Sequence, residues 1–262
     1  MFTYFVVSDI HGEFDKLIKG LENNGFKFKN KNHVLIVLGD AFDRGYQNER
    51  IFKFFINLYA EKRLYYVFGN HDGFLLDYLT GEDDGVFNAF NNGMHTTIKS
   101  FAKVKTVVNL PHIKLDSYRS LIDLEFPQLK RFLKNASLGL KLDNYVMTHA
   151  GFSRNHLDFD SNYPLYINPS ARTDMFVSRY QDTNFNNTYI FGHWHSRLLN
   201  KQFYNHENKK YKDNIFYLNS FIGIDGAVNL PTFDRVPVYI IKSSNLPKEL
   251  TIEDTLEKLE NN

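Results

Sequence analysis

The chain has 262 residues, 43% hydrophobic and 16% aromatic, so it is long enough to bury a large core within one α/β domain. A formal net charge of +1 argues against an extended basic surface for nucleic acid, and the absence of cysteine excludes disulfides and thiolate chemistry. The sequence shows no basic leader followed by an apolar stretch, and no run near the roughly 20 apolar residues of a membrane span. We therefore expect a cytoplasmic protein that binds neither membrane nor nucleic acid.

The first third of the chain alternates apolar strands with amphipathic helices. Continuous apolar runs predict buried strands at residues 3–8, 33–39 and 63–69. Residues 13–24 and 49–62 have the spacing of helices. This order predicts βαβ units and a mainly parallel sheet that is covered on both faces.

The rest of the chain is predicted to be helical first and then rich in strands. Residues 71–136 are expected to be largely helical, with Pro127 interrupting a long amphipathic stretch. Further strands are predicted at residues 145–151, 188–193, 215–220, 221–227 and 236–242. We expect one domain at residues 1–246 and a polar tail or helix at residues 247–262, with its helix at 252–262.

Five loops that follow predicted strands carry Asp, Asn or His next to a glycine. Their sequences are SDIHG (8–12), GDAFDRG (39–45), GNHD (69–72), THAG (148–151) and GHWH (192–195). In open α/β sheets, ligands bind outside the carboxyl ends of the strands. We therefore expect the five loops to meet at one site.

The donor atoms in these loops are those of a metal site without sulfur. The candidate ligands are Asp9, His11, Asp40, Asn70, His149, His193 and His195. Carboxylate and imidazole donors suit manganese, iron or zinc. Seven donors are too many for one ion, which takes about four protein ligands, and are enough for two if one aspartate bridges them. Paired ions clamp the attacking and leaving oxygens of phosphoryl transfer and acidify a bound water.

The ordered set of five motifs resembles the calcineurin-like metallophosphoesterases, and GDAFDRG resembles their phosphoprotein phosphatase branch. That branch contains lambda-type phage phosphatases, bacterial Ser/Thr phosphatases and symmetrical diadenosine tetraphosphatases. The resemblance covers about residues 3–242. It implies an α/β fold of the α+β kind, a β-sandwich of two mixed sheets flanked by helices. The absence of a targeting signal predicts the cytoplasm of a bacterium or of a phage-infected cell.

The resemblance implies two divalent ions, which we expect to be manganese, with iron or zinc as alternatives. It implies that Asp40 bridges both ions. The other ligands divide between the ions, with Asp9 and His11 on the first and Asn70, His149 and His193 on the second. His195 is a departure, because the branch often has Thr there. We leave it open between a ligand of the first ion and a hydrogen-bond partner of a ligand.

The catalytic roles also follow from the resemblance. His71 is expected to protonate the leaving oxygen, with Asp43 holding its imidazole in the charged form. Arg44 is expected to bind the phosphate through two parallel hydrogen bonds, and Asn70 to contact the substrate as well as a metal.

Two other positions bear on substrate binding. A second phosphate-binding arginine is expected at Arg179, with Arg172 as the competing choice. The segment IGIDGAV (222–228) resembles the last strand and turn of the family but lacks its threonine, so its part in substrate binding stays open.

The resemblance implies a phosphoric monoester hydrolase in which a hydroxide bridging two metals attacks phosphorus. We expect a phosphoserine/phosphothreonine protein phosphatase, with a symmetrical bis(5'-nucleosyl)-tetraphosphatase as the alternative enzyme. The alternative of another class is a non-catalytic, metal-bound binding protein on the same scaffold. The expected partner is a phosphorylated protein or a small phosphate or nucleotide, and the oligomeric state is not predicted.

Overall fold

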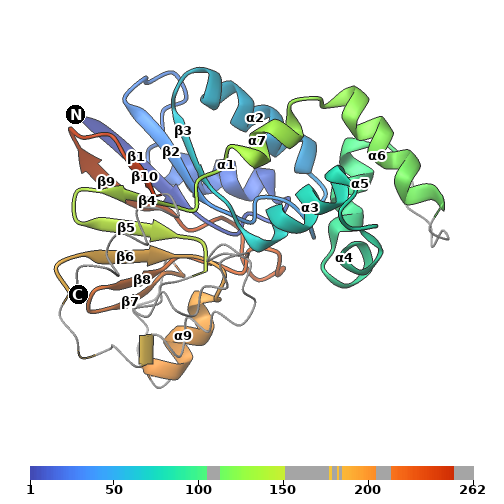
Figure 1. Ribbon diagram of the computed structural model, residues 1–262. Helices are drawn as coiled ribbons and strands as arrows, with labels where there is room; N and C mark the ends of the chain where they lie inside the picture. The colour runs from blue at the N-terminus through green and yellow to red at the C-terminus, as the bar shows by residue number, and fades with distance from the viewer. Residues whose placement is uncertain (105–112, 151–176, 179–181, 183–184, 205–213, 251–262) are drawn as a thin grey trace, which may run out of the picture.

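The computed structural model describes residues 1–104, 113–150, 177–178, 182, 185–204 and 214–250, and Figure 1 shows two β-sheets with most helices on one side. The strands of the first sheet are β1 (Phe2–Val7), β2 (His33–Leu38), β3 (Leu64–Val67) and β9 (Tyr239–Ser243). They lie in the order β3-β2-β1-β9, parallel from β3 to β1, with β9 antiparallel at the edge. The βαβ units predicted for the first third are therefore present.

The second sheet is also mixed. Its strands are β4 (Gly139–Leu142), β5 (Tyr145–Thr148), β6 (Thr188–Phe191), β7 (Phe216–Leu218), β8 (Phe221–Gly223) and β10 (Lys248–Leu250). They lie in the order β10-β4-β5-β6-β8-β7, with β5, β6 and β8 parallel to one another. The predicted α/β architecture with two mixed sheets is confirmed.

Alternation along β1 shows how the layers are stacked. Tyr4 and Val6 point into a core shared with residues of the second sheet such as Met147 and Ile190. Phe5 and Val7 pack into the core beneath the helices. Since successive side chains of a strand point to opposite faces, this continuous apolar strand is buried on both sides.

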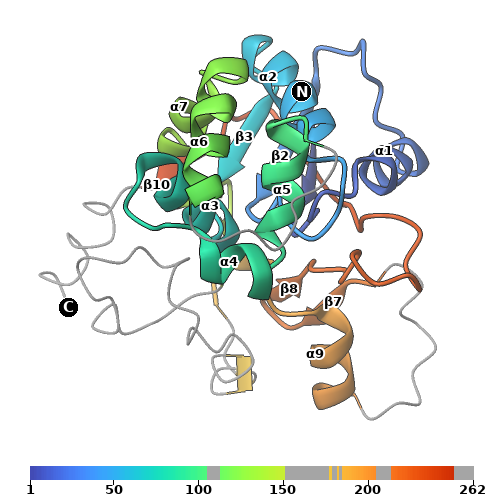
Figure 2. The ribbon, with the colours of Figure 1, turned by 90° about the vertical axis from the view of Figure 1, so that its right-hand side faces the viewer.

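The helical layer covers the outer face of the first sheet. It consists of α1 (Phe14–Asn23), α2 (Asn48–Ala60), α3 (Asn70–Thr80), α4 (Val86–Asn91), α5 (Met94–Phe101), α6 (Ile113–Glu125) and α7 (Leu129–Lys134). Pro127 lies in the break between α6 and α7, as predicted. In the view of Figure 2, α3, α4, α5 and α6 form one group beside β2 and β3.

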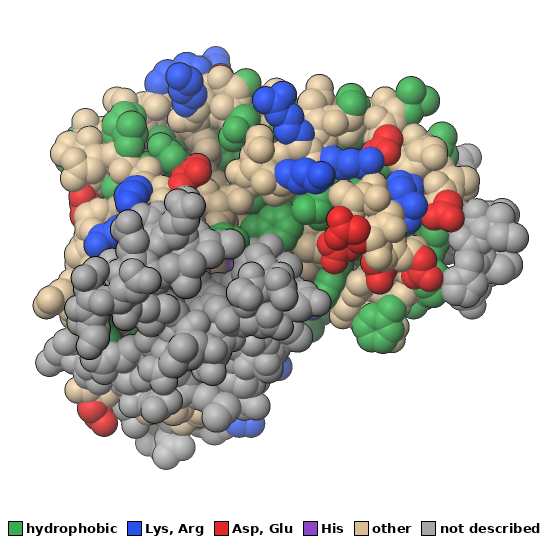
Figure 3. Space-filling model, viewed as in Figure 1, with side chains coloured by type: hydrophobic (Ala, Val, Ile, Leu, Met, Phe, Trp, Pro, Cys, Tyr) green, Lys and Arg blue, Asp and Glu red, His purple; other side chains and the backbone are tan. Residues whose placement is uncertain are grey.

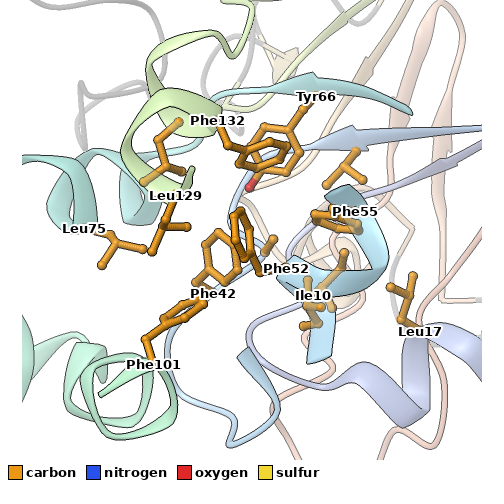
Figure 4. Packing of buried hydrophobic residues seen from close by; sticks show 14 of the residues in the cluster. Ile10, Leu17, Phe42, Phe52, Phe55, Tyr66, Leu75, Phe101, Leu129 and Phe132 are labelled. Atoms are coloured by element: carbon orange, nitrogen blue, oxygen red, sulfur yellow. The ribbon is translucent and has the colours of Figure 1, made fainter. Parts of the chain in front are cut away.

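Aromatic rings fill the core of the helical layer, as Figure 4 shows. Phe101 of α5 packs against Phe42, with 5.7 Å between ring centroids, and against Phe52 of α2 at 5.8 Å. Phe42 lies in the loop after β2, directly before Asp43. Burying a side chain of this size stabilises a protein by about 1.5–3 kcal/mol. The aromatic core therefore ties α5 to one of the motif loops.

Three elements differ from the prediction. The short strand β4 and the helix α9 (Ser196–Phe203) were not predicted. Residues 248–250, assigned from the sequence to a polar tail or helix, instead form the edge strand β10, which pairs with β4. The predicted helix at residues 252–262 lies outside the described residues. None of the described helices has the length and apolar character needed to cross a membrane.

Candidate active site

The five motif loops meet where the carboxyl ends of the strands of both sheets come together. Backbone hydrogen bonds join the loops after β1 and β2, from Asp9 N to Gly39 O and from His11 N to Asp40 O. Across the sandwich, the backbone N–H of His193 donates to Asp9 Oδ2 at 2.8 Å. The predicted convergence of the loops is therefore present in the structure.

Glycines allow this close approach. Gly39 has a φ of +76°, and a Cβ there would lie 2.6 Å from Gly69 Cα and 2.7 Å from His149 Nδ1. A Cβ at Gly192 would overlap Ser8 Oγ and Asp9 Oδ2. The contacts at these two glycines involve all five loops and both sheets, so the close approach of the loops depends on missing side chains at these positions.

Strained backbone is concentrated at the site. Six motif residues with side chains have left-handed φ angles: Asp9, His11, Asp40, Asp43, Arg44 and His193. Residues other than glycine adopt this conformation at a cost of about 1–3 kcal/mol each, and such residues cluster at functional sites. The surrounding hydrogen bonds and packing must therefore hold these loops in place.

Asp40 lies at the centre of the donors. Its Oδ2 is 3.4 Å from His149 Nε2 and 4.0 Å from His11 Nε2. Its Oδ1 accepts a hydrogen bond from the backbone N–H of His71 at 2.9 Å, at the N-terminus of α3. Asn70 Oδ1 lies 3.0 Å from His149 Nε2. The predicted bridging aspartate is thus surrounded by predicted ligands.

Within the part of the chain that the structure describes, two groups of donors share Asp40. One contains His11, Asp40 and His71, and the other contains Asp40, His149 and His193, with donor atoms within 4.8 Å of one another in each. Neither of these groups includes Asp9, whose Oδ2 instead accepts hydrogen bonds from Ser8 Oγ and His193 N.

Two histidines are already oriented for a metal. His11 Nδ1 lies 3.0 Å from the carbonyl oxygen of Phe42, and His149 Nδ1 lies 2.7 Å from that of Leu38. A carbonyl accepts only from an N–H, so both rings carry a proton on Nδ1 and turn Nε2 towards Asp40. Metal-binding histidines are typically oriented in this way. The donors present therefore fit divalent ions.

His71, Asp43 and Arg44 form a second cluster beside Asp40. His71 Nδ1 lies 2.7 Å from Asp43 Oδ2, and both side chains are buried. The exposed Arg44 reaches both groups, with Nη1 3.0 Å from His11 Nε2 and Nη2 3.1 Å from His71 Nε2. The predicted imidazole, its carboxylate and the phosphate-binding arginine are therefore brought together.

The charges of the site are strongly coupled. Burial opposes ionisation of Asp40, but His149 and His71 outweigh it and hold the pKa of Asp40 well below its usual value. Burial lowers the pKa of His149, but Asp40 and Asp9 raise it to about 10. For His71, burial is likewise outweighed by Asp40 and Asp43, which raise its pKa. These carboxylates therefore favour cations at this place.

His195 is not part of either group of donors around Asp40. His195 begins α9 with its side chain 30% exposed, and its Nε2 is 3.8 Å from Asp225 Oδ2, beyond hydrogen-bonding distance. Asp225, from the segment that departs from the family pattern, is buried and accepts a hydrogen bond from Ala227 N. Arg179 and Arg172 lie outside the described residues.

Sequence reasoning missed two supporting residues. Asp72, the last residue of GNHD, accepts hydrogen bonds at Oδ2 from Gly69 N at 2.8 Å and Asp40 N at 3.2 Å, and at Oδ1 from Tyr66 Oη. Thr97 on α5 bonds to Asp43. Asp72 was recognisable as an acidic residue three positions after a strand-ending glycine, a pattern that caps helices. No sequence pattern distinguishes Thr97 from other buried residues of an amphipathic helix.

Comparison with known proteins agrees with this geometry. The family model described as calcineurin-like phosphoesterase matches residues 2–197. A Bacillus subtilis protein named bis(5'-nucleosyl)-tetraphosphatase PrpE [asymmetrical] is 32% identical over 157 residues, which cover 57% of each chain. A symmetrical bis(5'-nucleosyl)-tetraphosphatase of Psychromonas ingrahamii is 33% identical over 153 residues, covering 58% of this chain and 45% of the relative. The chain spans about half the length of the curated relatives it matches.

Solved structures share the fold at low sequence identity. The cold-active protein-tyrosine phosphatase of a psychrophilic Shewanella has a TM-score of 0.52 at 14% identity, covering 93% of this chain and 76% of that one. A putative diadenosine tetraphosphatase has a TM-score of 0.50 at 16% identity, covering 93% and 94%. The family uses divalent metals, and His and Asp groups that could bind them are present here. The chain belongs to the calcineurin-like phosphoesterase family.

Proposed function

We propose that this chain hydrolyses bis(5'-nucleosyl) tetraphosphates, and that it cuts asymmetrically to give a nucleoside monophosphate and a nucleoside triphosphate. One observation carries the proposal. All five curated relatives that match are named bis(5'-nucleosyl)-tetraphosphatases, four of them asymmetrical. These names favour a bis(5'-nucleosyl)-tetraphosphatase over the phosphoserine/phosphothreonine phosphatase, and they favour the asymmetrical enzyme, whereas the alternative expected from the sequence was the symmetrical one.

We propose that two divalent ions would be held by the seven predicted ligands, of which Asp40 is common to both groups of donors: Asp9, His11, Asp40, Asn70, His149, His193 and His195. When bound, such ions polarise phosphoryl oxygens and lower the pKa of a water molecule. The Nδ1–H bonds of His11 and His149 to backbone carbonyls support the assignment, because they keep the two Nε2 atoms directed at Asp40.

His71 is the proton donor in this proposal. Asp43 Oδ2 receives its Nδ1–H, so Nε2, the atom that would carry the donated proton, faces the side on which Arg44 lies. Asp40 and Asp43 outweigh the burial of His71 and raise its pKa, which favours the charged form that can donate a proton. A positioned general acid contributes about 10²–10⁴-fold to the rate where the leaving oxygen is strongly basic, and less where the leaving group is itself a phosphate.

Arg44 binds phosphate in this proposal. Its side chain is exposed while its two Nη atoms reach His11 and His71, so the guanidinium lies at the entrance to the donor cluster. A guanidinium offers paired N–H groups to the oxygens of one phosphate. Asn70, Arg179 and Arg172 stay candidates for further contacts with the substrate.

The test is a product analysis on metal-stripped protein reconstituted with Mn²⁺. Diadenosine tetraphosphate is the substrate, and chromatography separates AMP plus ATP, the expected products, from two ADP. A phosphoserine peptide is assayed in parallel for phosphate release. Asp40→Asn is the control for contaminating hydrolases.

Each result has a defined meaning. AMP and ATP formed faster than peptide phosphate support the proposal. Two ADP would overturn the asymmetric cut, and faster release of peptide phosphate would restore the protein phosphatase. If the protein binds metal and diadenosine tetraphosphate without turnover of either substrate, the binding-protein hypothesis is favoured.

A further inference from the structure

The turn that carries Asp43 and Arg44 is unstable by itself. Both residues have left-handed backbone, with φ angles of +71° and +65°. Side chains other than glycine rarely adopt this conformation, and two in succession require support from outside the turn. The residues that support the turn therefore determine where the Asp43 carboxylate and the Arg44 guanidinium point.

Helix α5 provides hydrogen bonds to both residues of the turn. Gly93, which precedes the helix, accepts a hydrogen bond from Arg44 N at 3.1 Å. One turn further along, Thr97 Oγ1 accepts from Asp43 N at 2.8 Å and donates to Asp43 Oδ1 at 2.6 Å. Thr97 is fully buried. A single hydroxyl thus fixes both the backbone and the carboxylate of Asp43.

The two oxygens of Asp43 have separate partners as a result. Oδ1 receives the Thr97 hydroxyl, and Oδ2 is 2.7 Å from His71 Nδ1. A carboxylate held at one oxygen cannot rotate freely away from the imidazole at the other, so the His71 ring is fixed in orientation.

The helix itself is held independently of this hydroxyl. Phe101, at the end of α5, packs against Phe42 and against Phe126 of the segment after α6, with centroid distances of 5.7 and 5.0 Å. Figure 4 shows Phe101 beside Phe42. Loss of the Thr97 hydroxyl therefore leaves α5 in place and releases only Asp43.

We propose that Thr97 is a positioning residue that acts through Asp43 to hold the His71 imidazole in line with the leaving oxygen. The proposal rests on the proton-donor role of His71 proposed above. It assigns the α5 helix, which contains none of the five motifs, a part in the reaction.

The experiment compares wild type, Thr97→Val and Thr97→Ser on two phosphate monoesters. 4-Nitrophenyl phosphate has a good leaving group and phenyl phosphate a poor one, so only the latter depends strongly on protonation. We expect Thr97→Val to lower kcat for phenyl phosphate by about 10-fold or more and for 4-nitrophenyl phosphate by less than about 3-fold, since imperfect alignment removes part of general-acid catalysis. KM and bound metal should be unchanged, and Thr97→Ser should restore kcat.

The matched control is Thr96→Val. Thr96 is buried on the same helix, but its hydroxyl donates to Gly93 O, which also accepts the amides of Arg44 and Thr96 itself. Losing that hydroxyl should therefore lower stability as Thr97→Val does, without changing the ratio of the two kcat values. Equal kcat ratios in all four proteins would overturn the proposal.

A readout without turnover separates this proposal from the proposed function. Proton NMR of the metal-free protein should show a low-field imidazole N–H of His71, identified by its loss in His71→Asn. The signal should persist in Thr97→Ser and Thr96→Val and disappear or move upfield in Thr97→Val. If it is unchanged in Thr97→Val, the positioning role is wrong whatever the substrate is. If it responds as expected while diadenosine tetraphosphate is not cut, only the proposed function fails.

Discussion

The loops of the first sheet and the loop after β6 contribute donors in different ways. In the first sheet, Asp40, Asp43 and His71 are almost fully buried, and hydrogen bonds fix their side chains. After β6, the side chain of His195 is 30% exposed and its Nε2 lies 3.8 Å from Asp225 Oδ2. The same site thus has a closely fixed part and a more loosely fixed part.

The packing behind each part explains the difference. The loops after β2 and β3 are backed by α3, α5 and the aromatic core around Phe42 and Phe101. The loop after β6 is backed by α9 and a much smaller cluster around Phe191 and Leu199. A group that transfers a proton must be oriented before the reaction, whereas a metal ligand is also oriented by the ion that it binds. This difference supports the proposal that proton transfer depends on the loops of the first sheet.

The largest effect is expected for Asp40→Asn, which weakens the donor common to both groups. Loss of a shared carboxylate removes charge from both ions, so metal content should fall and turnover should drop by about 10³-fold or more. Metal analysis after gel filtration and an assay with diadenosine tetraphosphate check this. A variant that retains two metals and full activity would place the metal site elsewhere.

His71→Asn tests the proton-transfer part of the first sheet. An amide cannot donate a proton as an acid, so kcat for phenyl phosphate should fall by about 10²–10⁴-fold. The leaving group of a tetraphosphate is itself a phosphate with a pKa of about 6–7, so that substrate should lose much less. Metal content should stay normal. An equal loss for both substrates would show that His71 does not act as an acid.

Comparing His149→Ala with His195→Ala tests whether a ligand in the closely fixed part contributes more to metal affinity than a ligand in the loosely fixed part. His149 is fully buried with its Nδ1 fixed by Leu38 O, whereas His195 has no such fixed partner. We expect the affinity for Mn²⁺ to fall by about 100-fold in His149→Ala and by about 10-fold or less in His195→Ala. Titration calorimetry measures both, and the reverse order would contradict the comparison.

The charge distribution is consistent with a local rather than an extended binding surface. In Figure 3, basic and acidic side chains are interspersed over the helical layer on the face shown. A phosphate site needs only a few cations at one place, such as Arg44, in contrast to a nucleic-acid surface.

The sequence predicted the first sheet, the order of its helices and the convergence of the motif loops. Those features depend on local patterns, such as the apolar run of β2 ending in Gly39 and Asp40. The strand β10 was not predictable, because its three residues are exposed or half-buried and acquire their structure only by pairing with β4.

Prediction of the candidate site from the sequence is limited in the same way, to residues that a local pattern identifies. Asp9, His11 and Asp40 are recognisable because they stand at fixed distances from glycines in the chain. Thr97 is 54 residues from Asp43, and only the packing of α5 brings the two together. A buried threonine in an amphipathic helix has no sequence pattern that distinguishes it from other buried residues.

The smallest effect is expected for Tyr66→Phe, which tests how firmly the first sheet holds Asp40. Tyr66 Oη donates to Asp72 Oδ1 at 2.8 Å, and both residues are buried. Removing the hydroxyl leaves a buried carboxylate oxygen without this donor, which should lower the free energy of unfolding by about 1–3 kcal/mol. Tyr59→Phe, at a tyrosine that is 52% exposed, is the control and should change it by less than about 0.5 kcal/mol.

Activity is expected to change little in Tyr66→Phe. Asp72 Oδ2 still accepts the amides of Gly69 and Asp40, so the loop that carries the shared carboxylate keeps its position. Urea unfolding gives the stability and a diadenosine tetraphosphate assay gives kcat. A kcat that fell as far as in Asp40→Asn would mean that a single hydrogen bond maintains the position of Asp40. The close fixation of the first sheet would then depend on that bond and not on its many partners acting together.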